Sequence, residues 1–154
     1  MSLIYDFLHY LRKSYWRIFK IKTFGVRVII SKEGAFFLVQ HRYGGLWVFP
    51  GGGIKKQESL EEAAKREIKE EANIEIKSFN RKLGVYKNTK EGRNDTVTIL
   101  IAKDWQDSGR KWNWEIKDAG FFHTNSLPAS TSSATKRRIT EYLSGETKEF
   151  SGDW

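Results

Sequence analysis

Acidic residues are concentrated in one stretch of this chain, residues 58–75, although the chain as a whole is basic. The stretch contains seven glutamates against Lys65, Arg66 and Lys69, a balance of −4, whereas the whole chain has a formal net charge of +8. The other residues therefore carry +12. A basic body around one acidic region suits a divalent cation held beside a polyanionic substrate, because the positive field attracts phosphate. The same pattern suits nucleic acid, so charge alone does not choose between these ligands.

The glutamates are divided between two faces of one predicted helix. Ser59 and Glu62 match the capping box S-x-x-E, which predicts a helix over residues 59–73. At ~100° per residue, Glu67 and Glu71 fall in the middle of the apolar face and Glu70 falls at its margin. That face otherwise consists of Leu60, Ala63, Ala64, Ile68 and Ile74. The opposite face is interpreted as solvated, with i, i+4 pairs among Glu61, Glu62, Lys65 and Lys69.

Carboxylates on an apolar face are costly to bury unless something neutralises them. A hard divalent cation is one solution, because Mg²⁺ and Mn²⁺ prefer oxygen ligands and carboxylates at i, i+3 and i+4 converge on one point. A structural network of ion pairs with Arg or Lys from another strand is the alternative. The geometry favours the metal. His41 and His123 lack a metal-ligand spacing and are interpreted as strand or surface histidines.

A loop without bulky side chains is predicted ahead of this helix, formed by the sequence Pro50-Gly51-Gly52-Gly53. Such a loop lets the backbone approach a ligand or metal closely, although an ordinary loop that needs positive φ is the alternative. Beside converging carboxylates, the glycines favour a site where a divalent cation activates water and neutralises phosphoryl charge.

The stretch from Gly52 to Ile74 resembles the Nudix box, G-x5-E-x7-R-E-U-x-E-E-x-G-U, where U is aliphatic. Every fixed position matches except one, where Asn73 stands in place of the usual glycine. Asparagine is the non-glycine residue that best tolerates a left-handed helix end. The resemblance implies a Nudix fold, an α+β fold with a mixed β-sheet sandwiched between α-helices. It also implies hydrolysis, with Mg²⁺ or Mn²⁺ as cofactor, of a diphosphate linked to another moiety, often a nucleoside.

The resemblance further implies roles for individual residues. Arg66 would orient Glu67 by a charge-assisted contact, and Glu58 would brace the loop or reach the metal through water. The implied metal ligands are Glu67, Glu70, Glu71 and the carbonyl oxygen of Gly51.

The general base varies within the family. It is a glutamate of the box, Glu67 or Glu70, or a carboxylate from a later loop. Glu115, in "WNWEIKDAGFF", lies where such a later acid is often found. A surface strand residue is the alternative for Glu115.

Specificity in this fold depends on residues outside the box. Arg42 and Tyr43 could meet phosphate or stack on a base. For Trp47 we favour core packing over base stacking, and for Asn94 we favour capping of the "EGRND" turn over a sugar contact. The predicted substrate-binding residues are Arg42, Tyr43, Trp47, Gly52, Glu58 and Asn94.

The remaining pattern predicts the elements that position these residues. Strands are expected at residues 24–31 and 35–41, joined by a hairpin turn, and at 82–87, 95–103 and 118–124. Helices are expected at 132–145 and, as an amphipathic segment, at 3–20. We divide the chain into an N-terminal helical extension (1–21), a Nudix hydrolase domain (22–145) and a C-terminal tail (146–154). The N-terminal helix is expected to pack on its own domain, with a dimer contact or a membrane-surface role as alternatives.

Composition excludes several classes of protein. Cysteine is absent, so there are no disulfides, and no apolar run approaches the roughly 20 residues that cross a membrane. We therefore expect a cytoplasmic protein without a transmembrane segment, as a monomer or homodimer.

The function expected from the resemblance is metal-dependent hydrolysis of a small nucleoside-diphosphate-linked substrate, such as a (d)NTP or an NDP-sugar. One alternative is removal of pyrophosphate from RNA 5′ ends, which the basic body favours although no RNA-binding module is recognised. The other alternative is a Nudix-fold module that binds a ligand without turnover.

Overall fold

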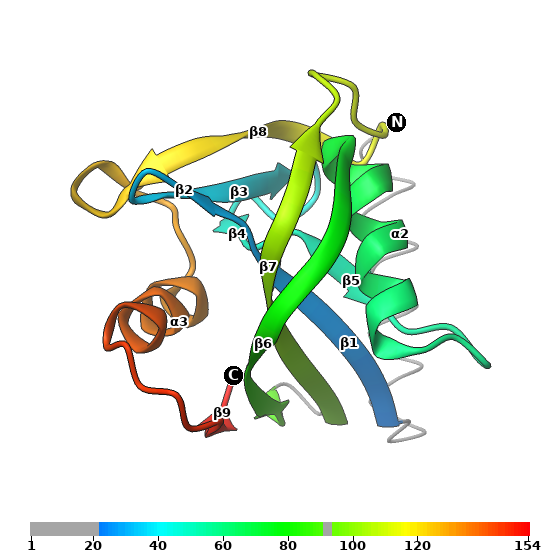
Figure 1. Cartoon of the computed structure of the whole chain (residues 1–154), viewed down its shortest axis with the longest axis vertical. Helices are drawn as coiled ribbons and strands as arrows, with labels where there is room; N and C mark the ends of the chain where they lie inside the picture. Colours follow the sequence, from blue (N-terminus) through cyan, green and yellow to red (C-terminus); the bar gives the residue numbers. More distant parts are fainter. Residues whose placement is uncertain (1–21, 91–93) are drawn as a thin grey trace.

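The computed structural model describes residues 22–90 and 94–154, and the predicted helix at 3–20 lies outside them. The described chain has an α+β fold in which β-sheets lie between two helices (Figure 1). Helix α2 (Leu60–Ala72) covers one side, and helix α3 (Ser133–Leu143) lies on the other. No helix among residues 22–90 and 94–154 has the length and apolarity needed to cross a membrane.

The larger sheet is mixed and has five strands in the order β5-β1-β7-β6-β9. Strands β1 and β7 run parallel, whereas β5 pairs antiparallel with β1 at one edge. The long strands β6 and β7 form an antiparallel pair in the middle of the molecule (Figure 1). The bounds are β1 Lys22–Ile29, β5 Gly51–Gly53, β6 Ile74–Asn88, β7 Asn94–Asp107 and β9 Phe150–Asp153.

The second sheet is built around β3, which pairs with β2, β4 and β8. The predicted hairpin turn is confirmed between β2 and β3, where Glu33 and Gly34 have φ of 52° and 79°. Two successive left-handed residues match the twist of the flanking strands. The bounds are β2 Ser31–Lys32, β3 Ala35–His41, β4 Trp47–Val48 and β8 Ile116–His123.

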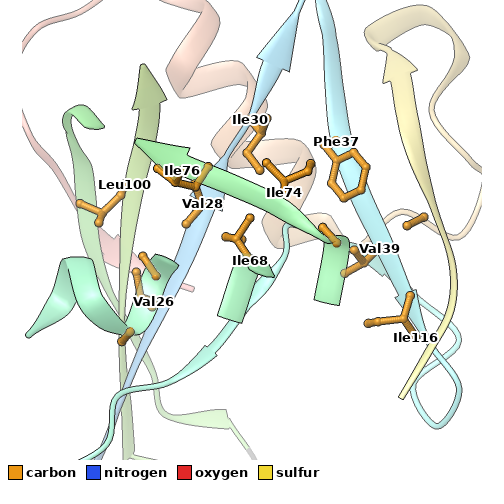
Figure 2. Close-up of a cluster of buried hydrophobic side chains, with 14 residues drawn as sticks. Val26, Val28, Ile30, Phe37, Val39, Ile68, Ile74, Ile76, Leu100 and Ile116 are labelled. Carbon is orange, nitrogen blue, oxygen red and sulfur yellow. The ribbon is translucent and has the colours of Figure 1, made fainter. Parts of the chain in front are cut away.

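Helix α2 is held by a core that it shares with both sheets (Figure 2). Its buried residue Ile68 packs among Val26 and Val28 of β1 and Ile74 of β6, as the apolar face predicted. Since side chains alternate along a strand, Val26 and Val28 fix the face of β1 that meets the helix, and Arg27 between them lies on the other face.

The prediction of a loop at the glycines was wrong in one respect. Gly51–Gly53 form the short strand β5, which pairs with Arg27, Val26 and Gly25 of β1. Sequence propensity disfavours glycine in strands, but the adjacent backbone of β1 supplies the pairing that propensity could not. The carboxylate-bearing helix therefore faces a sheet edge.

The C-terminal residues complete the sheet. Strand β9 pairs parallel with residues 84–87 of β6, and Trp154 N–H donates to the Lys87 carbonyl over 2.9 Å. Above this junction, the Arg138 guanidinium of α3 lies 3.8 Å from the centre of the Tyr86 ring and donates to Glu141. Burial raises the pKa of the Tyr86 hydroxyl, and its hydrogen bond to Glu141 adds to that shift. Residues 146–154 thus contain a strand of the main sheet.

We predict that Gly84→Ala weakens the docking of β9. A Cβ atom at position 84 would lie 2.5 Å from the Phe150 carbonyl oxygen and 2.5 Å from the Tyr86 hydroxyl oxygen. Overpacking of this kind costs about 1–3 kcal/mol in the free energy of unfolding, measurable by urea titration. Gly120→Ala is the matched control, because its nearest neighbours are Phe122 side-chain atoms at 3.7 Å. Equal stability of the two variants would contradict the prediction.

Candidate active site

Helix α2 is fixed at both ends by its own caps. The predicted capping box is confirmed: Ser59 Oγ accepts from the Glu62 N–H, and the Ser59 N–H donates to Glu62 Oε2 over 2.8 Å. At the other end, Asn73 adopts the left-handed conformation expected of it, with φ 53°, and its N–H donates to the Lys69 carbonyl. Its side-chain amide also donates to the carbonyls of Ser108 and Gly109. These contacts fix the rotation of the helix and the direction of its glutamates.

Glu71 is the buried carboxylate of this helix, with a side chain only 5% exposed. Its Oε1 lies 2.8 Å from His41 Nε2, and its Oε2 accepts from the Gly51 N–H, also over 2.8 Å. His41 lies in strand β3, as predicted, and is buried there. Sequence reasoning missed its partnership with Glu71. Burial does not alternate along β3, so the available signal was the two-residue spacing of His41 from Val39 and Phe37, which pack in the core shared with α2.

Arg66 joins the helix to the segment that precedes it. Its Nε donates to Glu58 over 2.7 Å, its Nη1 to Glu67 over 2.6 Å, and its Nη2 to the Gly53 carbonyl over 3.0 Å. Glu58 also accepts the Lys55 N–H over 2.9 Å. The hydrogen bond from Arg66 lowers the pKa of Glu58 to about 2, and the bond from Lys55 lowers it further. The hydrogen bonds to Glu58 and Glu67 raise the pKa of Arg66, so Arg66 and Glu58 stay charged at any ordinary pH.

Glu67 has a less favourable environment. Burial raises the pKa of this carboxyl, Arg66 opposes the shift, and the charges of Glu71 and Glu70 add to it. Gly52 lies directly against it: a Cβ atom there would lie 2.5 Å from the Glu67 carboxyl carbon. A side chain at position 52 would therefore displace the Glu67 carboxylate from its place against the strand. Glu70 is half-exposed, and its Oε2 lies 3.7 Å from Arg66 Nη1.

The donor set fits a hard divalent cation in its chemistry. Three carboxylates on one helix and the backbone carbonyls of the glycine strand supply oxygen, the ligand that Mg²⁺ prefers, although the Gly51 carbonyl also accepts from Arg27. The fit is also electrostatic, because Glu67 is desolvated and a cation would favour its charged form. Within the part of the chain that the structure describes, no three acidic or histidine side chains are grouped so as to enclose an ion. Both oxygens of Glu71 and one of Glu67 are instead directed at protein donors.

The loop before β8 contacts the C-terminal end of helix α2, where Glu70 and Glu71 lie. The Asn113 N–H donates to the Glu70 carbonyl over 3.1 Å, and the Arg42 N–H donates to the Glu115 carbonyl over 2.9 Å. Arg42 Nε also donates to the Trp114 carbonyl over 2.6 Å. Glu115 is therefore hydrogen-bonded through its backbone to Arg42, the residue that follows His41 in the chain, and His41 contacts Glu71.

The other predicted substrate residues lie in different surroundings. The Tyr43 ring stacks on His41 with centroids 5.4 Å apart and is half-exposed. Trp47 is buried edge-on against Phe122, in the core packing that we favoured for it. Asn94 begins β7, opposite Lys22 of β1. The structure therefore brings Gly52, Glu58 and the box residues together, with Arg42 and Tyr43 nearby, and places Trp47 in the core.

Comparison with known proteins gives a family match over most of the chain. A family model described as NUDIX domain matches residues 21–143. Diphosphoinositol polyphosphate phosphohydrolase 3-alpha of Mus musculus is 37% identical over 99 residues, which are 58% of this chain and 60% of that protein. Diphosphoinositol polyphosphate phosphohydrolase 2 of Homo sapiens is 38% identical over 97 residues, 58% of this chain and 53% of that protein. The match thus spans less than two thirds of either relative.

The fold also matches solved structures. The crystal structure of a MutT NUDIX hydrolase from Burkholderia pseudomallei has a TM-score of 0.71 and 23% identity, covering 79% of this chain and 98% of that chain. At this level of identity the likeness concerns the fold.

We predict that His41→Leu destabilises the protein by removing a donor from Glu71. An unsatisfied buried acceptor costs about 1–3 kcal/mol in the free energy of unfolding. His41→Gln is the matched variant, because its side-chain amide retains an N–H donor and should recover part of the loss. Urea unfolding at pH 7 in EDTA measures both variants. Wild-type stability of His41→Leu would contradict the partnership.

We predict a pH-dependent stability difference between the wild type and Glu58→Gln. Because the folded-state pKa of Glu58 is lowered to about 2, its contact with Arg66 stabilises the fold fully above the ordinary pKa of 4.5. That contribution is lost as the pH falls through about 2. Urea unfolding should therefore show the wild type more stable than the variant at pH 6, with the difference shrinking toward pH 2. A difference independent of pH would refute the assignment.

Proposed function

We propose a function for this chain from one premise: it belongs to the NUDIX domain family. We infer that it is a hydrolase that cleaves a diphosphate bond in a small phosphorylated substrate. The observation that carries the proposal is the arrangement of Glu67 and Glu71 against strand β5, with Arg66 bridging helix and strand and Glu70 beside Arg66.

Each of these residues has a proposed task. Glu67 and Glu70 present their carboxylates to the bound diphosphate, and one of them accepts a proton from the attacking water. Glu71 fixes Gly51, and Arg66 orients Glu67, because each makes the corresponding hydrogen bond. Glu115 is a further candidate for the base, since its backbone lies beside Arg42 next to the site.

The proposed cofactor is Mg²⁺ or Mn²⁺, held by Glu67, Glu70, Glu71 and the Gly51 carbonyl. A divalent cation bound there would neutralise charge on the phosphate oxygens and acidify a water molecule. The raised pKa of Glu67 supports this role, because a desolvated carboxyl gains most from a nearby cation.

The substrate proposal has two candidates. The first is a nucleoside-diphosphate-linked compound, such as a (d)NTP or an NDP-sugar, with Arg42 and Tyr43 contacting phosphate or base. The names of the relatives favour a second candidate, a polyphosphorylated inositol that carries a diphosphate. The net charge of +8 supports a strongly anionic substrate of this kind.

Hydrolysis of a substrate panel tests the proposal. Phosphate and pyrophosphate release would be measured with Mg²⁺, with Mn²⁺ and with EDTA. The panel contains NTPs, dNTPs, NDP-sugars, a diphosphoinositol polyphosphate and a 5′-triphosphate RNA. Metal-dependent turnover of one class is expected and would identify it. Turnover of the RNA alone would favour the 5′-end reaction, and binding without turnover would favour a silent module.

Within this test, we predict that Glu70→Gln lowers turnover about 100-fold or more while leaving the fold intact. Glu70 suits this substitution because it is half-exposed and its only charged contact among the described residues is with Arg66 at 3.7 Å. Glu71→Gln is less informative, since an amide would face the donors His41 and Gly51. Glu61→Gln, on the exposed face of the same helix, is the matched control. Full activity of Glu70→Gln would overturn the proposed role of the trio.

A further inference from the structure

Arg27 is a strand arginine that reaches the glycine strand from β1. Its Nη1 donates to the Gly51 carbonyl over 2.8 Å and to the Phe49 carbonyl over 3.1 Å. The residue is half-buried, and it lies on the face of β1 opposite to that of Val26 and Val28. Nothing in the box motif or in the sequence prediction assigns this residue a role.

The pairing of β5 with β1 determines which way the Gly51 groups point. Backbone bonds join Val28 to Pro50 and Ile54 to Phe24, so these are the hydrogen-bonded pairs of the ladder. Arg27 and Gly51, opposite one another, form a non-hydrogen-bonded pair between them. The N–H and C=O groups of Gly51 therefore both point away from β1, toward the outer edge of the sheet.

Three charged side chains meet this outer edge. The Glu71 carboxylate accepts from the Gly51 N–H, and Arg66 donates to the Gly53 carbonyl. Arg27 donates to the Gly51 carbonyl, so it contacts the same residue as Glu71. The guanidinium of Arg27 thus lies at the edge where the proposed site is built.

Arg27 has no carboxylate partner, in contrast to two other arginines near the core, although Arg81 likewise donates only to backbone carbonyls among the described residues. Arg66 pairs with Glu58 and Glu67, and Arg138 pairs with Glu141. Over residues 22–90 and 94–154, no carboxylate lies within ion-pair distance of Arg27, and no group accepts a hydrogen bond from its Nε or Nη2. With Nη1 anchored, the Nε and Nη2 donors form the remaining side-on fork, which matches two oxygens of a phosphate.

We propose that Arg27 binds a phosphate group of the substrate through this fork. The proposal rests on the proposed function, since it places the phosphate at the same sheet edge as the glutamate trio. The contact with Gly51 orients the guanidinium, and its charge compensates the anion where the nearby carboxylates would otherwise repel it. Arg27 and the glutamates would then hold the diphosphate from two sides of the glycine strand.

The test separates phosphate binding from bracing of the strand. Methylenediphosphonate, a diphosphate analogue that resists hydrolysis, is titrated by calorimetry in Mg²⁺ into the full chain and into Arg27→Gln. We expect affinity to fall about 10-fold or more, as for loss of charged hydrogen bonds. Arg27→Lys keeps the charge but loses the fork, and should lie between the two. With any substrate found by the panel, Arg27→Gln should raise KM more than it lowers kcat.

The matched control is Arg81→Gln. Arg81 is also a half-buried arginine of the same sheet, and it too donates to backbone carbonyls, those of Lys82 and Glu146. Both variants should lose some stability in urea, but Arg81→Gln should bind methylenediphosphonate like the wild type. If Arg27→Gln does not fold, Arg27→Lys against the wild type decides the question.

Two outcomes would overturn the inference: wild-type affinity in a folded Arg27 variant, or no binding of methylenediphosphonate by the wild type. Tight binding that depends on Arg27, without turnover of any panel substrate, would refute the hydrolase and leave the role of Arg27 standing. Turnover of a panel substrate, together with wild-type affinity in Arg27→Gln, would support the hydrolase and refute the role of Arg27.

Discussion

The buried carboxylate of Glu71 is the contact on which the arrangement of this site depends. It joins three elements, because it belongs to α2, accepts from Gly51 of β5 and meets His41 of β3. A carboxylate this well covered is stable only if both oxygens are hydrogen-bonded, and here both are. Since His41 and Gly51 belong to different sheets, the same side chain fixes the helix against both. The positions of Glu67 and Glu70 follow from that orientation of the helix.

The glycine strand β5 lies at the edge of its sheet, and within residues 22–90 and 94–154 no further strand pairs with its outward backbone groups. An edge strand presents unpaired N–H and C=O groups, which usually invite another strand. In β5, Glu71, Arg66 and Arg27 satisfy these groups instead. Gly52 adds a steric condition, because any side chain at this position would displace the Glu67 carboxyl. Along Gly51–Gly53, the backbone groups are therefore hydrogen-bonded by charged side chains where another strand would usually pair.

Local features of this fold were readable from sequence, whereas pairings between distant residues were not. The capping box of Ser59 and Glu62 and the left-handed Asn73 depend on neighbours within one helix, and both were predicted. Gly51–Gly53 form a strand only because they pair with β1, which lies far from them in the sequence, and this strand was missed. His41 and Arg27 were missed for the same reason, since each acts on a partner in another element. The two-residue spacing of His41 from Val39 and Phe37 carried a signal, because these two residues pack in the core shared with α2.

The charges around Arg66 show why the site is asymmetric. Glu58 receives two strong donors, so it is fully stabilised as an anion, and its pKa is about 2. Glu67 shares the same guanidinium, but desolvation and the charges of Glu71 and Glu70 raise the pKa of its carboxyl instead. One arginine cannot compensate both carboxylates equally, and the geometry gives most of its donors to Glu58. The protein thus keeps one glutamate satisfied as a brace and leaves its neighbour short of positive charge. A perturbed carboxyl of this kind is the feature on which the proposed cation site rests, because a nearby cation would favour its charged form.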